Sequence, residues 1–441
     1  MKNLIVLLII NTNIICNGFS QQPMDYVSCV EYALENNLAL KSFDYRIQRQ
    51  ASNYVSAYGN MLPNLSASTN LNISQGRTPD PNTNQIIDAD PFLSNNLSIS
   101  SGITLFNGFR LQNQLKFEKY RLLAANEDYL KQKNDITYLI LDAYVQYLIS
   151  LGLTDIQKEQ LEASEKEVYR IRKQIELGLS SGSDLYEAEA QKSTDEFLLV
   201  QNQNRTNTNE NTLKKLLNFP IDSTLVIVDI EIDSSQLLSV HEELAPNLSV
   251  LPEVKSTAAL LKAAKKQLKV ARGSLSPTLS AYANAGSGYL ETRRDAQDNP
   301  IEYQQQLDLN RSIGYGLSLS IPIFNRLARR NAIQQSKINY EEAENDMEII
   351  LRDTEYLVNE AILDYQGAIS EYQSAQKREQ SMELAFEVVQ KKREKGMISI
   401  MEFYQAKNNL ATARGQSLRT KLQLFLSERN IHFYLTGSFF E

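Results

Sequence analysis

The sequence predicts a mixed α/β membrane protein with an internal duplication, in which several chains share one β-barrel and each chain continues it with very long helices. Three observations support this fold class. Segments of the first half recur 214 or 218 residues later in the second half. Each half contains two uncharged stretches in which apolar and polar residues alternate. Each half also contains a run of about 70 residues without the turn signals that end a helix.

The first twenty residues predict a signal peptide. Lys2 supplies the positive charge, residues 4–10 are apolar, and residues 18–20 (GFS) form a small-x-small cleavage site. Cys16 leaves a lipoprotein alternative open, although the residues before it (NII) are not the usual small ones. No later segment offers about 20 consecutive apolar residues, so we expect an exported chain without a transmembrane helix.

The charge of the chain argues against a nucleic-acid partner. The sequence carries 53 acidic and 45 basic residues, a net charge of −8. One predicted helix has a strongly basic face. Because the chain as a whole is acidic, we expect this face to be solvated, and a polyanion-binding site is the alternative. The face consists of Lys262, Lys265, Lys266, Lys269 and Arg272.

Three pairs of similar segments define the duplication. The pairs are 59–63 (GNMLP) with 273–277 (GSLSP), 105–110 (LFNGFR) with 323–328 (IFNRLA), and 178–190 (GLSSGSDLYEAEA) with 396–408 (GMISIMEFYQAKN). We therefore expect a first repeat over 24–219 and a second over 247–437. Residues 220–246 would link the repeats, and 438–441 would form a tail.

The same elements are predicted in the same order in both repeats: a helix, two strands around a polar loop, a very long helix and a last helix. In the first repeat they span 25–58, 65–76, 96–105, 107–177 and 184–217. In the second they span 253–272, 278–290, 312–322, 325–395 and 399–435. Asn107 and Asn325 mark the strand-to-helix junctions, where each is a good N-cap.

The strands have one apolar face and one small polar face. In residues 312–321 (SIGYGLSLSI), Ile, Tyr and Leu alternate with Ser and Gly. An apolar outside and an uncharged polar inside suit a water-filled barrel in a bilayer. Four strands cannot close a barrel that needs about eight, so several chains must contribute. A periplasmic β-hairpin domain is the alternative.

The long helices predict coiled-coil packing. Ile333 begins a seven-residue series that reaches Val389, with Ala, Met, Tyr and Thr at the positions between them. About 70 residues at 1.5 Å each give a helix near 100 Å. Such helices could form the wall of a tube, or alternatively a solid fibrous bundle.

This ordered set of features resembles the TolC-like outer-membrane efflux proteins. The resemblance rests on the signal peptide, the duplication, two strands per half, the junctions LFNG and IFNR, and the Gly-led turns. It implies a homotrimer with a twelve-stranded barrel in outer-membrane lipid and a long α-helical barrel across the periplasm. Residues 220–246, with the C-terminal segment, would form a belt around the tube.

The function implied is that of a passive exit duct, coupled through a periplasmic adaptor protein to an inner-membrane pump. A close alternative is the outer-membrane component of a type I protein-secretion system. A different class, a structural coiled-coil protein of the envelope, also remains open. We expect no enzyme, because no catalytic motif is present.

Asp184 and Glu402 are the candidate pore residues. Each lies six residues after a turn glycine, Gly178 or Gly396, and the resemblance implies acidic side chains around a narrow periplasmic mouth. The alternative is that both residues only cap helices. The chain departs from the family's pattern at two positions, so the resemblance does not say how a closed state would be locked. Gln405 stands where relatives often have a second acid, and Ser399 stands where an arginine can lock the closed gate.

The remaining candidates are weaker. Tyr186 and Tyr404, equivalent in the two repeats, are expected to pack between helices. His241 and His432 are isolated from other metal-binding residues, so neither a metal nor another cofactor is expected.

Overall fold

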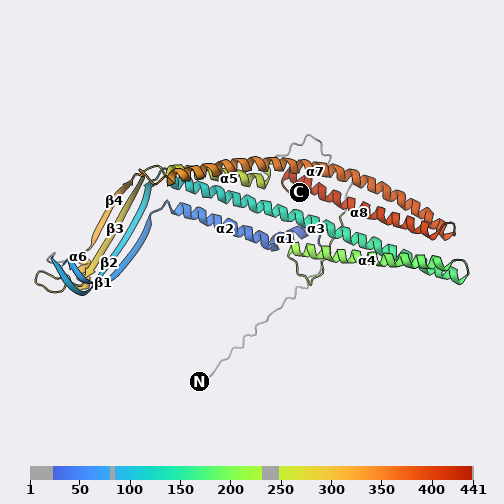
Figure 1. Cartoon of the computed structure of the whole chain (residues 1–441), viewed down its shortest axis with the longest axis horizontal. Helices are drawn as coiled ribbons and strands as arrows, with labels where there is room; N and C mark the ends of the chain where they lie inside the picture. The colour runs from blue at the N-terminus through green and yellow to red at the C-terminus, as the bar shows by residue number, and fades with distance from the viewer. Residues whose placement is uncertain (1–22, 80–84, 231–247, 440–441) are drawn as a thin grey trace, which may run out of the picture. The chain divides into compact units, whose positions relative to one another are not determined.

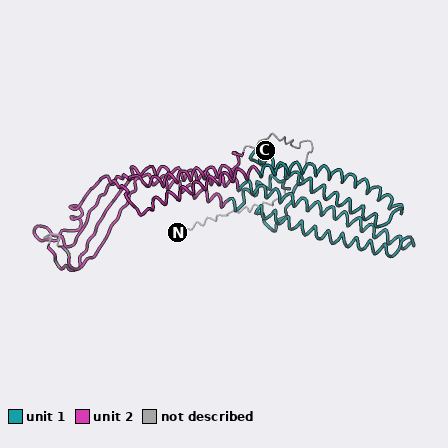
Figure 2. Tube along the Cα trace, turned by 45° about the horizontal axis from the view of Figure 1, so that its top comes forward, with its two compact units in different colours: residues 1–40, 132–246, 356–441 teal, residues 41–131, 247–355 magenta. Residues whose placement is uncertain are grey.

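The computed structural model describes residues 23–79, 85–230 and 248–439. The predicted signal peptide with Cys16, His241 and most of the linker predicted at 220–246 lie outside the described residues. The chain divides into two compact units, which Figure 2 distinguishes by colour. Unit 1 comprises residues 1–40, 132–246 and 356–441, and unit 2 comprises residues 41–131 and 247–355.

Unit 2 contains one antiparallel sheet with the strand order β1-β2-β3-β4 (Figure 1). Its strands are β1 (Asn64–Pro79), β2 (Ile86–Phe106), β3 (Thr278–Leu290) and β4 (Ser312–Ser320). The order joins the strands of both halves of the chain through the β2–β3 pair. The small alternating residues form strands because an alternating face suits a pleated sheet.

The polar face of the sheet is built from residues that fit closely across the strands. Ser66 and Ser68 pair with Ser100 and Ser98, with hydroxyl oxygens 2.8 Å apart in both pairs. Tyr282 lies opposite Gly316, where a Cβ would approach the tyrosine hydroxyl to 2.8 Å. The glycines of the alternating strands therefore make room for larger neighbours on the same face.

Most of the apolar face of the sheet is uncovered within the described residues, although residues 303–309 cover one end of it, where the Tyr303 hydroxyl donates to the Asn95 Oδ1 at 2.8 Å. Leu65, Ile73, Ile313 and Tyr315 are all exposed large side chains on these strands. In the described part of the chain, β1 and β4 also each have one edge without a strand partner. A sheet with an exposed apolar face and two open edges is unfavourable in water.

The strand predicted at 96–105 is eleven residues too short, ten of them at its start. β2 already begins at Ile86, and its pairing with β1 extends to Pro79 opposite Ile86, across an irregularity near Gly76. Backbone hydrogen bonds hold this part of the hairpin, so alternation of side chains is not required there. A short helix, α6 (Tyr303–Leu309), lies between β3 and β4 and was not predicted. The side chain of Gln306 fixes it by bonding both backbone groups of Leu290.

The helix predicted at 25–58 is two helices, α1 (Tyr26–Asn36) and α2 (Leu38–Gly59). Asn37 between them is extended, with φ −74° and ψ 118°. Its side-chain oxygen accepts hydrogen bonds from the backbone of Ala39 and Leu40 at 2.8 and 3.2 Å. Asn37 therefore ends one helix and caps the next.

The long helices begin three residues later than predicted. α3 spans Arg110–Glu176 and α7 spans Ala328–Glu394. Left-handed residues precede both, Gly108 and Phe109 in one case, and Arg326 and Leu327 in the other. The side chain of Asn107 still accepts from the Arg110 N–H at 3.0 Å, and that of Asn325 from the Arg329 N–H at 3.5 Å.

The other helices are α4 (Gly182–Leu217), α5 (Pro252–Gly273) and α8 (Ile400–Thr436), with a 3₁₀ turn, η1, at Leu248–Val250. In unit 1, α4 and α8 run beside the C-terminal parts of α3 and α7 (Figure 1). One 18-residue stretch of α3 has a mean hydropathy of 1.4. By length and composition alone, this stretch could cross a membrane. Within the structure 61 % of that stretch is buried, so its apolar residues serve packing inside the chain.

Candidate functional site at the helix turns

Both Gly-led turns of unit 1 have the same backbone geometry. Gly178 and Gly396 are left-handed, with φ 72° and 71°. The amides of the following residues, Leu179 and Met397, reach back to Gln174 and Lys392 at 2.8 and 2.9 Å. This bond pattern is the Schellman motif, which favours glycine at the left-handed position. Each turn thus reverses the chain directly into the next helix.

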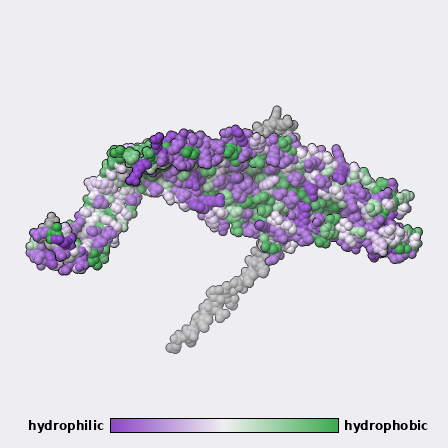
Figure 3. Space-filling view, viewed as in Figure 1, coloured by the Kyte–Doolittle hydropathy of each residue, from purple (hydrophilic) through white to green (hydrophobic). Residues whose placement is uncertain are grey.

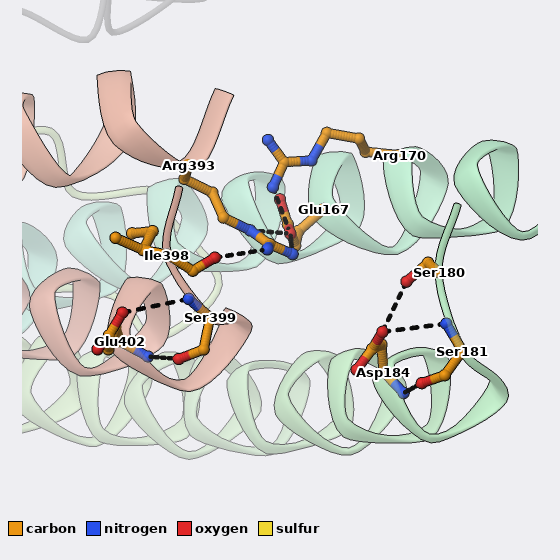
Figure 4. Close-up of polar contacts among 9 residues, drawn as sticks. All are labelled: Glu167, Arg170, Ser180, Ser181, Asp184, Arg393, Ile398, Ser399 and Glu402. Atoms are coloured by element: carbon orange, nitrogen blue, oxygen red, sulfur yellow. Dashed lines mark hydrogen bonds and ion pairs between the residues drawn. The ribbon is translucent and has the colours of Figure 1, made fainter. Parts of the chain in front are cut away.

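A reciprocal capping box follows each turn (Figure 4). Asp184 accepts from the Ser181 N–H at 3.1 Å, and Glu402 accepts from the Ser399 N–H at 3.1 Å. In return, the two serine hydroxyls accept from the acidic residues' own amides at 3.4 and 3.2 Å. Both acids therefore cap helices, and their carboxylates remain partly or fully open to solvent. Gln405 is exposed as well.

The first turn contains an extra hydrogen bond to its carboxylate. The Ser180 hydroxyl donates to the Asp184 Oδ2 at 2.7 Å. This bond, with those from Ser181 and the nearby positive charge of Arg393, lowers the pKa of Asp184 below its ordinary value. Asp184 is therefore ionised at neutral pH.

An ion pair that the sequence did not reveal holds the second turn. Glu167 of α3 is buried, and its Oε1 accepts from the Arg393 Nε at 2.9 Å and from Arg170 at 2.6 Å. Another nitrogen of Arg393 donates to the backbone oxygen of Ile398 at 3.2 Å (Figure 4). Arg393 thus ties the end of α7 and the turn after it to α3. An open groove of about 510 Å³ lies beside this pair, and Phe386, Gln390 and Glu394 are among the residues that line it.

A second buried ion pair lies deeper in the helices. Lys407 of α8 is 1 % exposed and Asp195 of α4 is 2 % exposed, with Nζ and Oδ2 2.6 Å apart. The Lys407 ammonium also donates to the Ser164 hydroxyl and the Gln160 carbonyl, at 2.7 and 3.1 Å. Burial lowers the pKa of Lys407, and the bond to Asp195 opposes that shift. All three donors of the ammonium are used, so this pair joins three helices.

The comparison with known proteins identifies the family. A family model described as "Outer membrane efflux protein" matches residues 29–218 and 248–437. The chain belongs to the outer membrane efflux protein family. The resemblance inferred from the sequence is therefore confirmed, and the chain is an outer-membrane efflux protein that extends into the periplasm.

Individual relatives of this efflux protein are distant but nearly complete. The outer membrane efflux protein BepC of Brucella suis is 20 % identical over 414 residues, covering 94 % of this chain and 85 % of BepC. The probable efflux pump outer membrane protein TtgC of Pseudomonas putida is 22 % identical over 423 residues, with 93 % and 83 % covered. Among solved structures, VceC of Vibrio cholerae has a TM-score of 0.79 at 14 % identity and covers 94 % of this chain. The alignment covers 96 % of the VceC chain.

Proposed function

We propose that three copies of this efflux protein form a homotrimer, with a twelve-stranded barrel in the outer membrane and a helical barrel in the periplasm. The observation that supports it best is the sheet of unit 2, which has an exposed apolar face, a small uncharged polar face and two open edges. Pairing β1 of one copy with β4 of the next would remove every edge. The apolar side chains would then face lipid, and the Ser, Asn and Gly face would line water.

The strand lengths are compatible with this placement. A strand needs about 9–11 residues to cross a bilayer, and β4, the shortest strand, has nine. The chain would be built from two repeats, 24–219 and 247–437, each contributing two strands. The repeated element order supports this division, as do the two matches to one family model.

The trimer would act as a passive exit duct that receives substrates from an adaptor protein and an inner-membrane pump. Relatives named as efflux-pump components favour efflux over type I protein secretion. The groove beside Arg393 is a candidate position for the adaptor, because it lies next to the turns where the duct would end. A structural envelope protein would leave the uncovered apolar sheet unexplained.

The turns that follow Gly178 and Gly396 would form the periplasmic mouth. Three copies would gather three Asp184 and three Glu402 carboxylates there, which would attract cations and repel anions. The field of these charges would extend about 8 Å at physiological salt, so selectivity should weaken as salt rises. Capping and a pore-facing role are compatible, because each carboxylate keeps free lone pairs.

Single-channel recording of the double variant Asp184→Asn/Glu402→Gln tests this function. The amides keep much of the capping geometry and remove the charge, so we expect a folded trimer without cation preference and without block by multivalent cations. Asp155→Asn removes an exposed charge of α3 that pairs with Lys158, and it should conduct like the parent. A double variant that also conducts like the parent would show that both acids serve only as caps.

A further inference from the structure

Five arginines surround the connections between strands and helices in unit 2. Arg110 is the first residue of α3, and Arg272 lies in the last turn of α5. Arg326, Arg329 and Arg330 lie just before and within the first turn of α7. We call these five residues the arginine collar.

The strand register brings the connections to one end of the sheet. Phe106, at the end of β2, pairs with Leu279, and Thr278, at the start of β3, pairs with Ser320 at the end of β4. The links β2–α3, α5–β3 and β4–α7 therefore leave the sheet side by side. The arginines of three helices follow within a few residues of these links.

Two of the links touch each other. A Cβ at Gly108, which has φ 68°, would come within 2.6 Å of the Gly273 carbonyl oxygen. A Cβ at Gly273 would come within 2.7 Å of the Arg110 Cγ. The stem of Arg110 therefore crosses the end of α5 next to Arg272.

The positive charge of the collar is not neutralised within the described residues, where none of its guanidinium groups lies within 4.0 Å of a carboxylate. Neither α3 nor α7 has an acidic residue in its first turn. The four arginines before or at the start of α3 and α7 oppose the helix dipoles, whereas Arg272 lies at the C-terminal end of α5, where a cation is favourable. Neighbouring like charges also repel each other. This arrangement is unfavourable for the isolated chain and becomes favourable when an external anion binds.

An exposed apolar belt adjoins the collar on the side of the strands. Ile323 is 95 % exposed and Phe324 is 77 % exposed, and Leu105, Phe106 and Phe109 are exposed as well. Figure 3 shows hydrophobic residues gathered where the strands meet the helices, with hydrophilic residues along the adjoining helices. Aromatic residues followed by basic residues are typical of a membrane–water interface.

We propose that the arginine collar binds the phosphate groups of anionic phospholipids in the periplasmic leaflet. The inference rests on the proposed function, which places the strands in the outer membrane. The headgroup layer is about 5–7 Å thick on each side, and the first turn of a helix rises about 5.4 Å, so the collar lies at headgroup depth. Arginine suits this ligand because its planar guanidinium binds phosphate in a bidentate manner.

The absence of tryptophan from the sequence allows a local test. Phe324→Trp places one fluorophore two residues from Arg326 in an exposed aromatic position. The trimer would be reconstituted into phosphatidylcholine vesicles containing brominated phosphatidylglycerol or, separately, brominated phosphatidylcholine. We expect the anionic lipid to quench more strongly, with a preference of about fivefold for each arginine involved, weakening as salt rises.

Two further variants carry the same tryptophan. Arg326→Gln/Arg329→Gln/Arg330→Gln should lower the preference for the anionic lipid by about fivefold for each arginine removed, and it should leave the share that is due to the other two arginines of the collar. Lys262→Gln/Lys265→Gln/Lys269→Gln removes the same charge from the basic face of α5 farther from the strands, and it should retain most of the preference.

Three results would overturn the inference. Equal quenching by both lipids in the parent would exclude the collar and leave the barrel intact. No quenching by either lipid would contradict the placement of the strands in the bilayer, and the proposed function with it. Altered ion selectivity in the arginine variant with unchanged lipid preference would place the guanidinium groups in the lumen.

Discussion

The last helices of the two halves, α4 and α8, have equivalent sequences but differ in what they bury. Tyr404 of α8 is 4 % exposed and packs among helices, as predicted. Its equivalent in α4, Tyr186, is 73 % exposed in the single chain, so its predicted packing between helices would need a helix of another copy. α8 buries most of its apolar side chains within the chain, whereas α4 leaves one row of apolar side chains, its open seam, exposed.

The same difference appears in their charged residues. Lys407 of α8 is buried against Asp195, and its equivalent in α4, Glu189, forms a largely exposed pair with Arg172. Ala413 occupies the position of α8 that is equivalent to Asp195. The duplication therefore preserves the order of elements while one half specialises in internal packing.

Removing the buried charge should have the largest effect. Lys407→Met leaves the Asp195 carboxylate buried without its cation, which should lower the free energy of unfolding by about 3–5 kcal/mol. Glu189→Met should cost at most about 1 kcal/mol because its pair is exposed. Urea midpoints of the detergent-solubilised protein, followed by circular dichroism, would compare the two.

A double variant separates the lost ion pair from lost packing. Lys407→Met/Asp195→Leu removes both charges, and it should recover most of the stability lost in Lys407→Met. If Lys407→Met lowered the free energy of unfolding no more than Glu189→Met does, the buried pair of α8 would not stabilise the fold more than the exposed pair of α4.

The open seam of α4 should matter for assembly. Tyr186, Phe197 and Val200 are exposed and share one face of α4, which we expect to pack against a neighbouring copy in the proposed trimer. Phe197→Ser should remove about 1.5–3 kcal/mol of burial from each interface and lower the temperature at which trimers release monomers in detergent. Size-exclusion chromatography with light scattering would measure it.

The matched control is Leu418→Ser, at the position of α8 equivalent to Val200. Leu418 packs against Gly152 within the same chain. This change should therefore lower the urea midpoint of the subunit without releasing folded monomers. Folded monomers from Leu418→Ser, or unchanged trimers from Phe197→Ser, would contradict the assignment of the α4 face.

The strands, the long helices and the turns could be predicted because their signals are local. Uncharged alternation marks the ten or so residues that sit in the sheet, and a glycine six residues before an acid marks each capped turn. The extension of β2 to Ile86 depends on backbone pairing with β1, which leaves no side-chain pattern. The break at Asn37 depends on one side-chain cap without glycine or proline.

The ion pairs could not be predicted because their partners are distant in sequence. Glu167 and Arg393 are 226 residues apart, and Lys407 and Asp195 are 212 residues apart. In sequence, each looks like one more charge on a solvated helix face. Only the packing of α3 with α7, and of α3 and α4 with α8, decides which charges are buried.

The two turns also differ at one position, which gives the smallest expected effect. Ser180 donates to Asp184 in the first turn, whereas the equivalent residue of the second turn is Ile398. Because the hydrogen bond lowers the pKa of Asp184, the ionised carboxylate stabilises the folded state above the ordinary pKa of an aspartate. That stability is lost as the pH falls through the lowered pKa of the folded state.

Ser180→Ala removes the largest contribution to this shift, so the pKa of Asp184 should rise toward its ordinary value. The ionised carboxylate should then stabilise the folded state less at neutral pH, and the loss of stability between about pH 5 and pH 3 should be smaller than in the parent, which urea midpoints across that range would detect. Ser183→Ala is the control, because the Ser183 hydroxyl lies 2.9 Å from that of Ser181 and has no bond to the carboxylate. If the urea midpoints of both variants depended on pH in the same way, the Ser180 hydroxyl would not set the pKa of Asp184, and the two turns would respond to acid alike.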